Sequence, residues 1–315
     1  MKKLYSRFEK RDFFFVYMLI ALPVLQFVVF WFYVNCSSFT LAFKNKVSGE
    51  WALDNFKEIW TMMTNPQEKG MSLLDMLGRS FALWFVSNVI VFPISLCTTY
   101  VLFRRVSGHY FFRVIYMLPS LLGGVVWVAT MKQVLSNHGA VVYILKQLKI
   151  PLSTAVQNDG LLFDPKTAFL TLCFTVILFG IAGGNAVITG AYSRIPTELF
   201  EVGKLDGISF WREFFVICLP CIWPTVSTLL TFSLCGIFSG EGNVFLYTNG
   251  TGRPQMATIG FYLQRLVVDL EGSSAVWENP YGIPSGIGML LTLATLPVAL
   301  IGRVVLEKLV EAVET

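Results

Sequence analysis

Residues 194–220 read RIPTELFEVGKLDGISFWREFFVICLP, a polar segment that separates two long apolar ones. Within it, three residues lie between Gly203 and Gly207, and nine lie between Gly207 and Ile217. The stretch closes as Ile-Cys-Leu-Pro at residue 220. This fixed spacing makes the segment the most informative part of the chain, and the apolar sequence around it indicates the class of fold.

The polar segment itself predicts a short helix. Pro196 suits the first helical turn, where its missing N–H would be unpaired in any case. Glu198 and Glu201 favour the positive end of the helix dipole, and Gly207 is a ready stop. We therefore expect a helix of about eleven residues, roughly 16 Å long, with Ser209 capping the helix that follows. A Pro start and a Gly stop alone are equally typical of any interfacial helix.

The rest of the chain is too apolar for a soluble globule of this size. Its 315 residues are 55% hydrophobic and 14% charged, with a mean hydropathy of +0.63. Six segments contain no Asp, Glu, Lys or Arg, and each is long enough to cross roughly 30 Å of hydrocarbon as a helix: residues 13–34, 80–103, 114–131, 167–192, 214–239 and 283–302. The composition predicts an all-α, polytopic membrane protein with six transmembrane helices in a single domain, residues 1–315.

Basic residues in the connections predict the orientation of these spans. With the amino terminus inside, Lys and Arg are more than twice as dense in the inner connections as in the outer ones. We therefore expect both termini and the 193–213 loop to face the cytoplasm. The first span is longer than the apolar run of a signal peptide and has no small-residue cleavage site after it, so we expect it to stay attached.

Two outer stretches, residues 48–60 and 261–270, mix apolar and charged residues at helical intervals. They predict short helices on the outer surface. Such helices either cap the bundle or receive a partner protein, and the sequence favours neither role.

The spacing of the polar segment resembles the EAA loop of binding-protein-dependent ABC importers, the cytoplasmic element by which a membrane subunit grips its ATPase. Three other stretches resemble the same family, in the branch that carries oligosaccharides and larger glycans. They are an aromatic span opening with AFK and NFK boxes (residues 33–34, 42–44 and 55–57), an LP-to-WVV segment (118–127), and a Gly-Trp-Asn box that lacks its Trp (Gly184, Asn185).

The loop departs from the family pattern at one point. The Ala-Ala that usually follows the glutamate is replaced by Val202 and Gly203 after Glu201. A glycine inside a helix costs up to about 1 kcal/mol relative to alanine. It would soften the helix or admit the close approach of a partner backbone, whereas Glu201, Asp206 and Gly207 keep the pattern.

The resemblance implies the membrane permease subunit of an importer that moves a carbohydrate, an oligosaccharide, into a prokaryotic cell through the plasma (inner) membrane. It further implies a second, similar permease subunit, two ABC ATPase subunits, and an extracellular or periplasmic solute-binding protein. The chain itself contains no G-x-x-x-x-G-K-[ST] sequence. We therefore expect ATP and Mg²⁺ on the partner ATPase, and no cofactor, metal or catalytic residue on this chain.

The resemblance also assigns residues to the coupling with the ATPase. Glu201 is expected to pair with a basic group of the ATPase with Asp206 in support, and Gly207 permits the turn between two helices. Each carboxylate has an alternative role as a solvated or dipole-stabilising side chain. The full set of expected coupling residues is Glu198, Glu201, Gly203, Asp206, Gly207, Leu219 and Pro220.

Neutral polar and aromatic side chains within the spans are candidates for the translocation path, because lipid offers polar groups no partner. These candidates are Asn88, Trp127, Asn185, Thr189 and Thr228. The alternative is that they hold helices together, an explanation favoured for Asn185 by its glycine neighbours, while Trp127 would simply pack.

Other functional classes fit the sequence less well. A membrane enzyme would need clustered titratable groups, but His109 and His138 lie in separate connections. An ion-coupled secondary transporter usually buries a carboxylate or Lys within its spans, and these spans hold none.

Cys218 and Cys221 form a CxxC pair in an apolar setting, which disfavours zinc or redox chemistry. A net charge of +4 does not indicate nucleic acid. An ABC permease for a non-sugar solute stays open, and the sequence does not identify the sugar.

Overall fold

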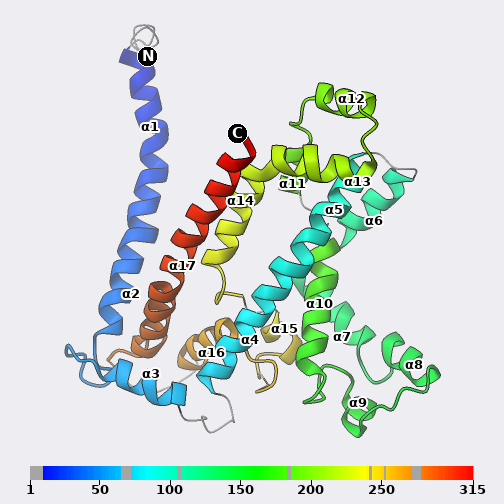
Figure 1. Cartoon of the computed structure of the whole chain (residues 1–315). Coiled ribbons are helices and arrows are strands. Elements are labelled where there is room, and N and C mark those ends of the chain that lie inside the picture. The colour runs from blue at the N-terminus through cyan, green and yellow to red at the C-terminus, as the bar shows by residue number, and fades with distance from the viewer. Residues whose placement is uncertain are drawn as a thin grey trace. The chain divides into compact units, whose positions relative to one another are not determined.

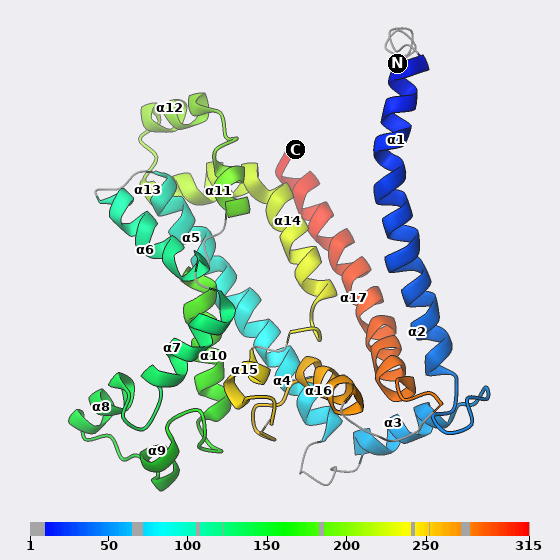
Figure 2. The same ribbon diagram turned by 180° about the vertical axis from the view of Figure 1, so that it is seen from behind.

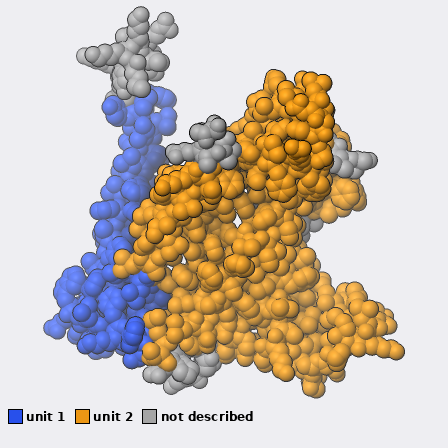
Figure 3. Space-filling model, viewed as in Figure 1, with its two compact units in different colours: residues 1–61, 267–290 blue, residues 62–266, 291–315 orange. Residues whose placement is uncertain are grey.

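The computed structural model describes residues 10–64, 72–104, 108–121, 123–182, 186–240, 243–251, 253–271 and 278–314. Throughout these ranges the regular elements are helices, and the only strand-like pairing is an isolated antiparallel bridge between Lys44 and Trp51. The predicted all-α fold class is therefore confirmed. The chain forms two compact units, residues 1–61 with 267–290 and residues 62–266 with 291–315 (Figure 3).

The described residues form seventeen α-helices, labelled in Figure 1, and three π-helical stretches. They are α1 Lys10–Gln26, η2 Phe27–Tyr33, α2 Val34–Ala42, α3 Asp54–Thr64, α4 Leu73–Phe85, η3 Val86–Val91, α5 Phe92–Phe103, α6 His109–Leu121, α7 Gly124–Val134, α8 Ala140–Gln147, α9 Thr154–Asp159, α10 Ala168–Ala182, α11 Ala186–Tyr192, α12 Thr197–Leu205, α13 Phe210–Glu213, η4 Phe214–Cys218, α14 Leu219–Cys235, α15 Val244–Thr248, α16 Ile259–Glu271 and α17 Gly282–Glu314.

Several of these elements join into helices long and apolar enough to cross a membrane. Within the described residues there are four: Phe15–Ala42, Leu73–Phe103, Phe210–Cys235 and Gly282–Leu309. In sequence, these four helices overlap the first, second, fifth and sixth predicted spans. Helices α10 and α11, bent by 41° with respect to each other, form a candidate fifth span over the fourth prediction.

The third predicted span, residues 114–131, is divided between two shorter helices. Helix α6 ends at Leu121 and α7 begins at Gly124. Gly123 between them has an extended backbone, with φ −57° and ψ 149°. Consecutive glycines lose the most backbone entropy on entering a helix, so a break is least costly here. The count of six spans thus stays a prediction.

Proline accounts for two of the π-helical stretches. Stretch η3 ends two residues before Pro93, and η4 ends two residues before Pro220. A proline cannot donate a hydrogen bond to the carbonyl four residues earlier, and its ring displaces that carbonyl. The helix continues by widening locally instead of breaking.

In the smaller unit, two buried asparagines hold the chain that leaves α2. Asn55 Nδ2 donates to the carbonyl oxygens of Ala42 (3.0 Å) and Lys44 (2.7 Å), and Asn279 Nδ2 donates to the same Lys44 oxygen (2.7 Å). A Cβ at Gly282 would lie 2.7 Å from Asn55 Nδ2, so glycine is required there. The AFK and NFK boxes therefore meet as one hydrogen-bonded turn.

We expect Asn55→Ala to destabilise the smaller unit by about 1–3 kcal/mol, because the buried Ala42 carbonyl oxygen loses the Asn55 donor and the Lys44 carbonyl oxygen keeps only Asn279. Thermal unfolding of the purified protein in detergent measures this loss as a lower Tm. Asn35→Ala is the matched control, since Asn35 is exposed and donates only within its own helix, to the Trp31 carbonyl. Equal Tm shifts for the two variants would contradict the prediction.

Candidate functional site

Helix α12 lies at one end of the larger unit, close to α13 in both views (Figures 1 and 2). It spans nine residues against the eleven expected, because the extended backbone of Pro196 (ψ 136°) places that residue at the N-cap and not in the first turn. Gly207 follows the helix with φ +67°, a conformation that glycine adopts without strain. Ser209 stands at the N-cap of α13 as expected, although its side chain makes no capping hydrogen bond.

The outer surface of α12 combines negative charge with apolar side chains. Glu198, Glu201 and Asp206 are exposed, and so are Val202 and Leu205. Leu205 has 88% of its surface exposed, the highest value among the large apolar residues of the described chain. The outer surface of α12 therefore presents apolar side chains and carboxylates side by side.

The inner surface of α12 is held by one aromatic ring. Phe200 is buried, packs against Phe103 with ring centroids 6.0 Å apart, and lies 4.9 Å from the guanidinium carbon of Arg104. Gly203 is the other buried residue of the helix, and a Cβ there would lie 3.0 Å from Ile217 Cδ1. The departure from Ala-Ala therefore lets α12 approach the chain's own Ile217.

A buried carboxylate lies beneath this helix. Glu213, only 4% exposed, accepts hydrogen bonds from Arg104 Nε at 2.8 Å and Arg104 Nη2 at 2.9 Å. The hydroxyl of Tyr100 donates to the same carboxylate at 2.8 Å. Charge-assisted pairs with this two-pronged geometry are among the strongest protein hydrogen bonds. The pair was not predicted from the sequence, although each partner stands at the edge of an apolar span.

The two remaining coupling candidates lie where α14 begins. Leu219 and Pro220 are half-buried, and Leu219 packs against a hydrophobic cluster. This cluster contains Leu96, Tyr100, Ile188, Ala191, Tyr192, Ile195, Phe200, Phe214, Cys218, Ile222 and Val226. Cys218 is buried in it whereas Cys221 is exposed. No group of His, Cys, Asp and Glu suited to a metal ion occurs among the described residues.

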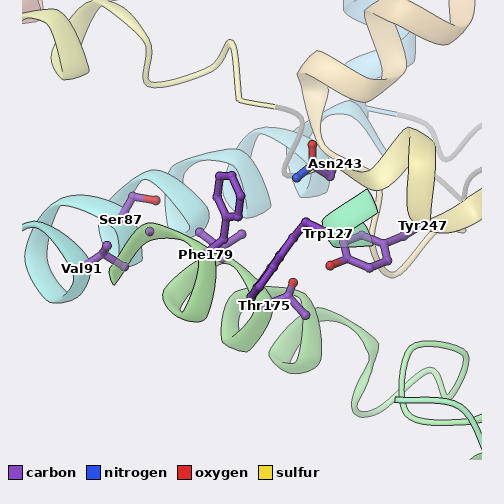
Figure 4. Close-up of a pocket in the computed structure, with 9 residues that line it drawn as sticks. Ser87, Val91, Trp127, Thr175, Phe179, Asn243 and Tyr247 are labelled. Atoms are coloured by element: carbon purple, nitrogen blue, oxygen red, sulfur yellow. The ribbon is translucent and has the colours of Figure 1, made fainter. Parts of the chain in front are cut away.

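The larger unit also contains a cavity of about 390 Å³. Its walls come from η3, α7, α10 and α15, and its lining residues are Ser87, Val91, Trp127, Thr175, Val176, Phe179, Gly180, Asn243 and Tyr247 (Figure 4). None of these residues is charged. Gly180 brings two walls together, because a Cβ there would lie 2.5 Å from Val91 Cγ1.

Aromatic rings and neutral polar groups face one another in this cavity. Trp127 and Phe179 pack with ring centroids 5.5 Å apart. The hydroxyls of Tyr247 and Thr175 point toward each other (Figure 4), and that of Thr175 donates to the Leu172 carbonyl at 2.8 Å. The Tyr247 hydroxyl is buried and makes no hydrogen bond of good geometry among the described residues, where the Thr175 side chain is the polar group that interacts with it. Burial raises the pKa of Tyr247 above its usual range, so the hydroxyl stays neutral at physiological pH.

Comparison with known proteins finds relatives that match most of this chain. No family model matches the chain. The arabinooligosaccharides transport system permease protein AraP of Bacillus subtilis (strain 168) is 24% identical over 297 residues, 90% of this chain and 86% of AraP. The probable ABC transporter permease protein YesP of the same strain is 23% identical over 268 residues, 84% of this chain and 82% of YesP. Over most of its length the chain is similar to ABC transporter permeases.

A solved structure shares the fold. A chain from the crystal structure of a bacterial ABC transporter involved in the import of the acidic polysaccharide alginate superposes on this chain with a TM-score of 0.72. The two chains are 19% identical, and the match covers 97% of this chain and 99% of the other.

The structure brings one of the predicted path residues to the cavity, namely Trp127. Asn88 instead joins two helices: its Nδ2 donates to the Trp84 carbonyl at 2.8 Å and its Oδ1 accepts from Ser233 Oγ at 2.6 Å. Thr228 is exposed, and its hydroxyl donates to the Pro224 carbonyl at 2.8 Å within α14.

The other two path candidates lie elsewhere. Thr189 is half-buried on α11, away from the cavity lining. Asn185, with Gly183 and Gly184, lies outside the described residues. Tyr247, Thr175 and Asn243 were not predicted. Thr175 is a lone polar residue within an apolar run, whereas Tyr247 and Asn243 lie in an outer connection, outside the predicted spans. Asn243 has a left-handed backbone, with φ 59°, which asparagine tolerates better than most residues.

Proposed function

We propose that this permease is the membrane subunit of a carbohydrate importer that moves an oligosaccharide into the cytoplasm, driven by ATP hydrolysis on separate subunits. The relative AraP is named for arabinooligosaccharides, and the structural neighbour for import of alginate. Both names specify chains of sugar units. The uncharged cavity of the permease favours a neutral saccharide over an acidic one, because it offers aromatic faces and neutral hydrogen-bonding groups but no cation.

The observation that carries the proposal is the construction of α12, which is exposed on its outer surface and packed against the larger unit by its inner one. In this role Glu201 pairs with a basic group of the ATPase, with Glu198 and Asp206 in support. Gly203 seats the helix on the bundle and Gly207 permits the turn that follows. Movement then reaches the membrane through Leu219 and Pro220 at the start of α14.

The proposed assembly contains a second permease subunit, two ABC ATPase subunits that hold ATP and Mg²⁺, and a solute-binding protein. A further structural neighbour, with a TM-score of 0.70 and 19% identity, was crystallised as an alginate ABC transporter with an alginate pentasaccharide-bound periplasmic protein. That complex supports the last partner. The proposal places the permease in the inner membrane with both termini in the cytoplasm.

The cavity is proposed as part of the translocation path. Its volume lies within the usual range of ligand pockets, about 300–1,000 Å³, and accommodates a short part of a saccharide chain. Trp127 and Phe179 would face the apolar side of a sugar ring. Tyr247 and Asn243 would bond to its hydroxyls, and these bonds would satisfy the buried Tyr247 hydroxyl.

Affinity purification of the permease from native membranes tests the assembly. We expect a Walker-motif ATPase and a second polytopic membrane protein to copurify. Recovery of the permease alone from mild detergent, with its fold intact, would contradict the proposal.

Glu201→Ala tests the role of α12 in the same complex. We expect the ATPase rate to fall about tenfold, the loss typical of one hydrogen bond to a charged group. Asp159→Ala is the matched control, because Asp159 is also exposed but lies on α9, at the opposite end of the larger unit (Figure 1). Equal ATPase rates for wild type and Glu201→Ala would exclude Glu201 from coupling.

A further inference from the structure

We propose that Arg104 is the positioning residue that carries the movement of α12 to α5, acting through Glu213 and Phe200. The inference rests on the proposed function, in which α12 receives the movement of an ATPase. It concerns residues that neither the loop motif nor the comparisons assign.

A single guanidinium connects three elements. Arg104 is the C-cap residue of α5. Its Nε and Nη2 donate to the two carboxylate oxygens of Glu213 at the end of α13, at 2.8 and 2.9 Å. The face of the same group lies over the ring of Phe200 on α12, 4.9 Å from its centroid. Helices α5, α12 and α13 therefore meet at one side chain.

The chemistry of arginine suits this position. Its planar guanidinium can donate in a fork to a carboxylate while its face stacks on an aromatic ring, whereas the lysine ammonium can do neither in the same way. Glu213 retains 6% of its side-chain exposure and Arg104 24%, so salt screens the pair little. Loss of one partner would leave the other as a poorly compensated buried charge.

A third hydrogen bond to Glu213, from Tyr100, also holds α13 against α5. Tyr100, fully buried on α5, donates to Glu213 Oε1 at 2.8 Å, and its hydroxyl also lies 3.0 Å from the Phe210 carbonyl oxygen. Both ends of the short helix α13 are thus held by α5. Directional bonds of this kind fix relative position, whereas apolar contacts such as that between Phe103 and Phe200 permit sliding.

The test uses the complete complex in lipid nanodiscs and follows amide hydrogen exchange with and without trapping by ADP and vanadate. In the wild type, trapping is expected to change exchange in two peptides, one covering α12 (residues 197–205) and one covering the end of α5 (residues 99–104). In Glu213→Gln, which keeps the shape of the side chain, the change in α12 persists. The change in α5 falls at least fivefold, within the usual range of coupling between sites.

Two further variants sharpen the result. Arg104→Lys keeps the charge but loses the fork and the stacking, and is expected to give an intermediate response in α5; it also serves as the test should Glu213→Gln fail to assemble. Glu307→Gln removes the exposed ion pair with Arg303 and is expected to respond as the wild type. If these residues served folding alone, the variants would alter the amide exchange of both peptides before trapping. The changes caused by trapping would then keep the same ratio between α12 and α5 as in the wild type.

The possible failures are distinguishable. If trapping changes nothing in α12 of the wild type, the proposed coupling function itself is refuted. If Glu213→Gln and Arg104→Lys both transmit the full change to α5, the apolar contacts suffice and the positioning role of Arg104 is overturned.

Discussion

Phe200→Ala is expected to reduce ATP-driven uptake about a hundredfold or more while the ATPase still copurifies. Phe200 is the only large buried side chain of α12, and the other buried position, Gly203, has no side chain to hold the helix. Truncation of a buried phenylalanine to alanine usually costs about 3–5 kcal/mol, and each 1.4 kcal/mol changes an equilibrium about tenfold. The ATPase would then move a helix that is no longer seated on the bundle.

Uptake of a radiolabelled oligosaccharide that the wild type accepts, normalised to the amount of permease in the membrane, measures this loss. Phe200→Leu keeps an apolar side chain and is expected to retain part of the activity. Phe111→Ala is the control for the same substitution at an exposed position of the larger unit. Uptake by Phe200→Ala at the wild-type rate would show that α12 is held by other contacts.

The sequence predicted α12 well because its signals are local. Pro196 and Gly207 restrict the backbone by their own chemistry, so the two ends of the helix can be placed within about two residues. The role of Gly203 was beyond the sequence, since it depends on how closely Ile217 approaches from the next helical segment. A glycine that is costly within its helix thus serves the packing between two segments.

The buried pair of Arg104 and Glu213 shows a different limit. The two residues are 109 positions apart, and each stands immediately outside a charge-free span. Dividing the chain by its charges assigned both to the connections, where solvent would surround them. Only the return of α13 onto the end of α5 brings them together, and no local pattern encodes that contact.

The candidate path residues were chosen because they are polar or aromatic residues within spans. Residue type alone does not show which group each side chain bonds to. Asn88 bonds to the Trp84 carbonyl of its own helix and to Ser233 of α14, and Thr228 bonds within its own helix. The bonds of both residues are therefore made within the helix bundle. Trp127 reaches the cavity and Tyr247 was not foreseen. A polar side chain within a span must find a partner somewhere, but the three-dimensional contacts decide whether that partner is a helix or a solute.

Trp127→Ala is expected to reduce saccharide uptake between about ten- and a hundredfold. Trp127 is buried and packs on Phe179 in the cavity wall. Its loss removes an aromatic face and leaves a cavity wider than the saccharide fills.

Tyr247→Phe removes only the buried hydroxyl, and is expected to raise the apparent KM about tenfold through one lost hydrogen bond. Kinetics of uptake by intact cells separate these effects.

Two controls decide whether the cavity lies on the path. Thr228→Ala should leave the apparent KM unchanged, because the Thr228 hydroxyl bonds within α14, and Trp60→Ala should do the same at an exposed tryptophan of the smaller unit. Wild-type kinetics in both Trp127→Ala and Tyr247→Phe would exclude the cavity from the path. A raised KM in both, with unaltered basal ATPase, would instead require that the saccharide contacts this cavity, since neither residue touches the buried network that joins α5, α12 and α13.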